Sequence, residues 1–86
     1  MDKRVALIGI LVENMDSVPA LNTMLHAHYK HIIGRMGLPY REKDVHVISI
    51  AVDAPEAVIK ELTDGIRTLD GVTLQVTCST VCDKRS

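Results

Sequence analysis

Aromatic residues are nearly absent from this chain: among its 86 residues there are two tyrosines, no tryptophan and no phenylalanine. Hydrophobic residues nevertheless make up 47% of the chain, so a core must be built from aliphatic side chains. Catalytic pockets and surfaces that stack nucleic-acid bases commonly use aromatic side chains. The scarcity of aromatics therefore argues against both kinds of site.

A strong net charge is also missing. The chain has ten lysines and arginines and eleven acidic residues, which gives a formal net charge of -1. No segment is basic enough to form a nucleic-acid footprint by itself. Direct binding to nucleic acid is therefore not expected.

Membrane, secretory and disulfide signals are lacking as well. No apolar run approaches the roughly 20 residues of a membrane-spanning helix, and the N-terminal segment has no small-residue cleavage site. The two cysteines, Cys78 and Cys82, are too few for a disulfide-stapled scaffold. We therefore expect a soluble cytoplasmic protein with no membrane contact.

The most apolar segment runs from Val5 to Val12. Alternate residues of a strand point to opposite faces of its sheet, so both faces of this strand need cover. The chain has sequence for only two helices, which cover one face. A single domain of this size also has a marginal core. We therefore expect a homo-oligomer, a dimer or tetramer, in which a second copy or a ligand covers the other face.

Hydrophobic periodicity divides the chain into strands and helices. The first helix is predicted to begin at Asp16 or Ser17, and the second at a capping-box-like segment, Asp53 to Glu56, ending before Gly71 as a left-handed stop. The helices bury stripes formed by Val18, Leu21, Leu25 and His28 and by Val58, Ile59, Leu62, Ile66 and Leu69. The predicted strands are residues 5–12, 32–36, 45–52 and 72–78, with a hairpin loop at 37–44.

The resulting order is βαββαβ. With right-handed crossovers this order predicts an α+β, ferredoxin-like sandwich, in which a four-stranded antiparallel sheet carries two helices on one face. The domain is expected to span residues 1–78, followed by a polar C-terminal tail at 79–86 that frays.

The hairpin segment also carries a family resemblance. Residues 33–43, Ile-Gly-Arg-Met-Gly-Leu-Pro-Tyr-Arg-Glu-Lys, resemble the strand–loop signature of the ACT-like proteins called iron-only hydrogenase system regulators. The resemblance covers roughly residues 4 to 77, and supporting matches are Leu25-His26, Val47-Ile48-Ser49, Val52-Asp53, Leu62-Thr63 and Gly71-Val72. It implies a homo-oligomeric regulatory or sensing domain rather than an enzyme.

Two polar groups are candidate ligand-binding residues for a small-molecule effector. One is Glu13, Asn14 and Asp16, which follow the first strand, and the other is Arg35 and Arg41 in the hairpin. The arginines could clamp an anion or select a partner chain by charge. The alternatives are that the first group caps the helix and that the second lies in a solvated loop. Amino-acid-binding ACT domains usually have a glycine after the first strand, and none is present here.

Histidines supply the candidate metal site. His26, His28 and His31, with Cys78, could ligate a transition metal. On a helix His26 and His28 lie about 200° apart, so they cannot share an ion unless the helix ends between them. The alternative interpretation leaves His26 and His31 exposed near the helix C-terminus and places His28 in the buried stripe.

The cysteines allow two interpretations. Cys78 and Cys82 could hold a metal or cluster with ligands from another subunit, or respond to oxidation. Alternatively Cys78 fills the core and Cys82 lies in a loose tail. A disulfide between them needs a turn at Ser79-Thr80, because a continuous strand separates their Cα atoms by about 13 Å.

Three functions therefore remain open. The favoured hypothesis is a small non-enzymatic regulatory or sensing domain that homo-oligomerises through its sheet. The second is a metal- or redox-handling accessory protein for metallocluster assembly. The third is a purely structural oligomerisation module.

Overall fold

Four strands and two helices make up the described part of the chain. A computed structural model describes residues 3–82, with side chains for residues 3–79. The elements in chain order are β1 (Lys3–Val12), α1 (Val18–Ala27), β2 (Ile32–Tyr40), β3 (Val45–Pro55), α2 (Glu56–Arg67) and β4 (Val72–Cys82). Single 3-10 turns stand at η1 (Met15–Ser17), η2 (Tyr29–His31) and η3 (Arg41–Lys43).

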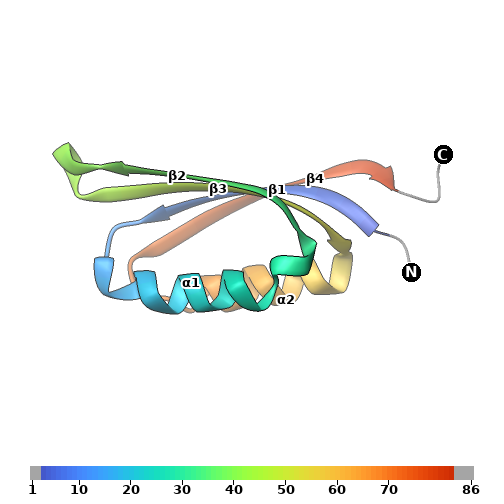
Figure 1. Cartoon of the computed structure of the whole chain (residues 1–86), viewed down its shortest axis with the longest axis horizontal. Helices are drawn as coiled ribbons and strands as arrows, with labels where there is room; N and C mark the ends of the chain where they lie inside the picture. Colours follow the sequence, from blue (N-terminus) through green and yellow to red (C-terminus); the bar gives the residue numbers. More distant parts are fainter. Residues whose placement is uncertain (1–2, 83–86) are drawn as a thin grey trace.

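The strands form one antiparallel sheet in the order β2-β3-β1-β4. Both helices lie on the same side of this sheet, and no element covers the other side within the described residues (Figure 1). This arrangement confirms the predicted ferredoxin-like α+β sandwich. No helix in the described part of the chain is both long and apolar enough to cross a membrane.

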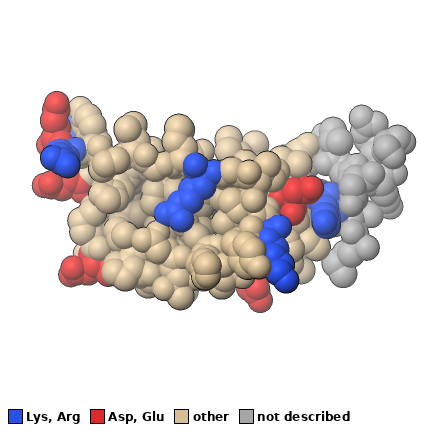
Figure 2. Space-filling model, in the orientation of Figure 1, with Lys and Arg blue, Asp and Glu red and all other residues tan. Residues whose placement is uncertain are grey.

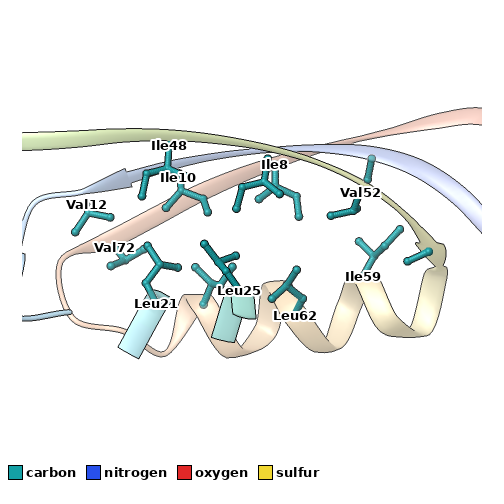
Figure 3. Packing of buried hydrophobic residues seen from close by; sticks show 14 residues of the cluster. Ile8, Ile10, Val12, Leu21, Leu25, Ile48, Val52, Ile59, Leu62 and Val72 are labelled. Atoms are coloured by element: carbon teal, nitrogen blue, oxygen red, sulfur yellow. The ribbon is translucent and has the colours of Figure 1, made fainter. Parts of the chain in front are cut away.

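The core lies between the sheet and the helices and is entirely aliphatic (Figure 3). On β1 alone, every second residue from Ala6 to Val12 is at most 1% exposed, while the residues between them are exposed. The same alternation continues along β3. The buried set includes Ile8, Ile10, Val12, Leu21, Leu25, Ile48, Ile50, Val52, Ile59, Leu62 and Ile66. The period of two thus selects one face of the sheet for the core.

The first helix starts at one of the two predicted positions, whereas the second starts later than predicted. Neither helix has a side-chain cap: α1 begins after Ser17, and α2 begins after Pro55. The predicted capping box is wrong because β3 continues through Asp53 to Pro55, in register with β1. The predicted stripes are confirmed at their centres, since α1 buries Leu21 and Leu25. Likewise, α2 buries Ile59, Leu62 and Ile66.

The hairpin is longer and its turn shorter than predicted. Residues 37–40, which the sequence assigned to a loop, belong to β2 and pair with β3 up to Tyr40 and Val45. Pro39 is tolerated because β2 is an edge strand, where a missing backbone N–H can face solvent. The turn closes at Asp44, whose φ of 52° is left-handed. The expected 37–44 loop is therefore wrong in its first half.

The last strand is also longer than predicted. β4 continues through Ser79 to Cys82, with a register shift where it pairs with β1 between Arg4 and Ala6. The predicted C-terminal tail at 79–86 therefore begins within a strand, and its last four residues lie outside the described part of the chain.

On α2, the pKa of the Asp64 carboxyl lies below its ordinary value, mainly because Lys60 Nζ donates a hydrogen bond to it at 2.6 Å. Desolvation opposes this effect, and the charges of Lys60 and Arg67 reinforce it. We expect Lys60→Met to raise the pKa of Asp64 in an NMR titration, and Arg67→Met to raise it less. Because folding lowers this pKa, the contribution to stability is present above the unfolded-state pKa and is lost as the pH falls through the folded-state pKa. An unchanged Asp64 titration in Lys60→Met would contradict this interpretation.

Candidate functional site

The side of the sheet that faces away from the helices is the main candidate site. Its strands present three rows of residues in register, with one residue from each of β2, β3, β1 and β4. We call these twelve residues the open face: Gly34, Ala51, Leu7 and Thr77; Met36, Ser49, Gly9 and Gln75; Leu38, Val47, Leu11 and Thr73. None of them is charged. In Figure 2, charged side chains gather at the hairpin tip, while uncharged residues form the outline above the sheet.

Large apolar side chains of the open face are in contact with solvent. Met36 is 67% exposed, Leu38 60% and Leu7 53%, and Leu11 and Val47 are also exposed. Soluble monomers rarely expose apolar patches larger than a few hundred Å², and larger ones commonly mark interaction surfaces. The open face is therefore a candidate binding surface.

Four small residues lie together within this surface, and we call them the small-residue patch. Gly34, Ala51, Ser49 and Gly9 are adjacent in the register, two in one row and two in the next. A Cβ atom added at Gly9 or Gly34 would meet nothing within 4 Å. These glycines are therefore not required by packing inside the chain. Sequence reasoning predicted an uncovered face but not these residues, because their adjacency depends on the register between strands.

The predicted ligand residues after β1 are part of a structural junction. Asn14 Oδ1 accepts a hydrogen bond from the Asp16 backbone N–H at 3.0 Å, and Asn14 Nδ2 donates to Asp70 Oδ2 at 2.7 Å. The Glu13 N–H donates to the Gly71 carbonyl at 2.7 Å. These bonds join the β1–α1 connection to the α2–β4 turn. Asn14 thus has its polar atoms engaged, whereas the side chains of Glu13 and Asp16 are exposed.

We expect Asn14→Ala to destabilise the fold by about 1 kcal/mol, because it removes the N-terminal cap of η1 and a hydrogen bond between two loops. Asn14→Asp keeps the acceptor for Asp16 N–H but places a carboxylate beside Asp70, so it should recover little of the loss. Urea unfolding of the three proteins measures this difference. A free energy of unfolding that is unchanged in Asn14→Ala would show that the junction is not stabilised in this way.

The two predicted arginines lie apart. Arg35 sits opposite Ile50 in the register, on the helix side, and its Nη2 donates to Asn22 Oδ1 of α1 at 2.8 Å. Arg41 lies in η3 at the hairpin turn. The five predicted ligand residues therefore do not form one cluster: three stand at the junction, one against α1 and one at the hairpin tip.

The structure does not assemble the predicted histidine site. α1 ends at Ala27, between His26 and His28, so the helix does end where a shared ion would require it. His26 stacks on Tyr29, while His28 is half-buried, with Nδ1 2.9 Å from the Met24 carbonyl and Nε2 3.2 Å from Glu61 Oε1. Among the described residues, no three His, Cys, Asp or Glu side chains come together as a metal site.

Cys78 is exposed, so the interpretation that it fills the core is wrong. Its partner in the register is Ala6, which places it on the helix side, but β4 is an edge strand whose end continues past the helices (Figure 1). β4 continues through Ser79-Thr80 to Cys82 without the turn that a disulfide was expected to need, and its register against β1 shifts between Cys78 and Cys82. The side chain of Cys82 lies outside the described residues.

Solved structures share this fold. TM1266 of Thermotoga maritima, described as an uncharacterized protein, is similar with a TM-score of 0.85 and 23% identity over 88% of this chain and 96% of its own. A formyltetrahydrofolate deformylase of Pseudomonas putida KT2440 is similar with a TM-score of 0.61 and 11% identity, over 85% of this chain but 28% of its own. The designed protein Foldit4 has a TM-score of 0.60 and 16% identity, over 92% of this chain and 98% of its own. At these identities the likeness shows the fold alone.

Family membership comes from the sequence match. Among curated proteins, none matches this chain. Residues 4–76 match a family model whose description reads "TM1266-like: Iron-only hydrogenase system regulator, putative". This range spans β1 to β4 and includes the hairpin signature. The chain belongs to the TM1266-like family.

Proposed function

We propose that this chain is a small regulatory module of an iron-only hydrogenase system and that it works as a homo-oligomer paired through the open face. The family description supports a regulatory role rather than an enzymatic one. The observation that carries the pairing is the open face itself, which is uncharged and exposes large aliphatic side chains.

The open face has the size of the centre of a dimer interface. Four strands about 4.8 Å apart, each followed over the five residues that the three rows span at about 3.3 Å per residue, give a projected area of roughly 300 Å². The accessible area of a surface with protruding side chains exceeds its projection. A specific interface buries about 800 Å² per partner, so the open face is large enough to form the centre of such an interface, with neighbouring residues completing it.

The chemistry of the open face fits a second copy of the chain. A two-fold interface places the same surface on both sides, so a surface must be complementary to itself. Here the small-residue patch stands beside large residues such as Leu7 and Met36, which can pack on the small-residue patch of the partner. Because the face carries no charge, pairing buries no unpaired ion.

A larger side chain in the small-residue patch tests this proposal. Gly9→Val adds a side chain into open space on the open face, and Gly37→Val adds the same atoms on the opposite side of the sheet, where Gly37 pairs with Ile48. Both variants should fold, since valine favours strands. We expect Gly9→Val to raise the dissociation constant at least tenfold in light-scattering measurements across a dilution series, and Gly37→Val to leave it unchanged. Equal association of wild type and Gly9→Val would contradict the proposed interface.

The regulatory part has a cellular test. In a host that contains an iron-only hydrogenase system, the chromosomal copy is replaced by Leu7→Lys, and by Ala57→Lys as a control on the exposed surface of α2. We expect hydrogenase expression or activity in the Leu7→Lys strain to match a deletion, and the control to match wild type. A Leu7→Lys strain that regulates normally would show that pairing is not needed for function.

A further inference from the structure

A cavity of about 300 Å³ lies beneath the β2–β3 hairpin, away from the residues of the open face. The hairpin projects beyond the start of α1, so its last residues have no helix beneath them (Figure 1). Met15 of η1 closes the cavity from the other side, and Pro39, Tyr40 and Val45 contribute further walls. Its volume is at the lower end for small-molecule sites and equals that of about ten water molecules.

The cavity combines these apolar walls with three polar side chains, Arg41, Asp44 and His46. Within residues 3–79, none of the three makes a side-chain hydrogen bond or ion pair in the structure. Asp44 has a structural role, because its left-handed backbone closes the hairpin turn. The guanidinium of Arg41 and the imidazole of His46 have no such role. They are donors beside an apolar space.

We propose that this cavity binds a small monocarboxylate with an apolar body. A guanidinium binds a carboxylate through two parallel hydrogen bonds, and His46 offers a further ring nitrogen. The apolar body would lie against Met15 and Pro39. Asp44 repels a second negative charge, so inorganic phosphate and dicarboxylates should bind poorly.

The regulatory consequence of this site rests on the proposed function. Tyr40 and Val45 are register partners that follow Leu38 and Val47 along the hairpin, so they continue the side of the sheet to which the open face belongs. The same two residues line the cavity. A bound carboxylate would therefore change the packing at the edge of the dimer interface, and differential affinity for the two association states would transmit the signal.

NMR titration of the ¹⁵N-labelled full chain tests the site. The probes are benzoate and isovalerate, with benzamide, isovaleramide and inorganic phosphate as comparisons. We expect saturable shifts at the amides of Met15, Arg41 and His46 with both carboxylates, and at least tenfold weaker binding of the amides and of phosphate. Arg41→Gln should weaken carboxylate binding at least tenfold, whereas Arg67→Gln on α2 should not change it. No localised shifts, equal binding of the amides, or an unaffected Arg41→Gln would overturn the site.

The same titration in Leu7→Lys separates the two proposals. Carboxylate binding in that variant, together with a wild type that does not associate, would uphold the cavity and overturn the proposed function. A wild type that associates but binds no carboxylate would uphold the proposed function and overturn the cavity as a binding site. If both hold, saturating benzoate should change the dissociation constant of the wild-type dimer at least threefold, and an unchanged constant would overturn the coupling between them.

Discussion

Gly71→Ala should lower the free energy of unfolding by about 2–4 kcal/mol. Gly71 has a φ of +69°, which costs a residue with a Cβ roughly 1–2 kcal/mol. The added Cβ would also stand 2.9 Å from the Asn14 backbone nitrogen and 2.5 Å from Asn14 Cβ. Backbone cannot move aside as a side-chain tip can, so overpacking adds about 1–3 kcal/mol. The Glu13–Gly71 backbone hydrogen bond, at 2.7 Å, holds the two segments together.

Thermal or urea unfolding measures this loss. A domain of this size loses about 4–8 °C in Tm per kcal/mol, so Gly71→Ala should melt about 8–32 °C lower than wild type. Gly37→Ala is a matched control, because it adds a Cβ into open space outside the open face and Gly37 has no left-handed φ. It should be neutral or slightly stabilising. A loss below about 0.5 kcal/mol in Gly71→Ala would mean that the junction is looser than its hydrogen bonds indicate.

Leu7→Lys should have the largest effect on association. Leu7 is 53% exposed at the centre of β1, so lysine is accommodated in the single chain with little change in stability. In a two-fold dimer the substitution occurs twice, and each ammonium group would be buried against an uncharged surface. The desolvation of unpaired charges costs several kcal/mol, so the dissociation constant should rise at least about 100-fold.

Analytical ultracentrifugation of Leu7→Lys, Ala57→Lys and wild type measures this effect. Ala57→Lys introduces the same charge on the exposed surface of α2 and should associate as wild type does. Circular dichroism melting of all three proteins shows whether the chain still folds. A folded Leu7→Lys that associates as tightly as wild type would place the interface elsewhere, with the edges of the sheet as the next candidates.

The sequence predicted the fold because its strongest signals are local. Alternation in residues 5–12 and the three- and four-residue spacing in the helices are set by the geometry of strand and helix. The left-handed Gly71 after α2 was also predictable, since few other residues adopt that conformation. These signals fix which residues form the core, and the structure confirms them.

Element ends and site residues depend on contacts between distant segments. Pro39 is a turn signal in the sequence, but its place on an edge strand lets β2 continue past it. Asp53 is a helix-cap signal, but pairing with β1 keeps it in β3. Likewise the sequence suggests Asn14 as a ligand residue, but in the structure its side chain is hydrogen-bonded to Asp70, which is 56 residues away. Pairing of this kind is not visible in a single sequence.

The mass of the wild-type protein in solution tests the central claim most directly. Sedimentation equilibrium of the full chain from about 1 to 100 μM should give a weight-average mass that rises to at least twice the 9.5 kDa of one chain. A constant mass of 9.5 kDa over the whole range would show that the open face remains in contact with water, and the account of this chain as a paired module would be wrong.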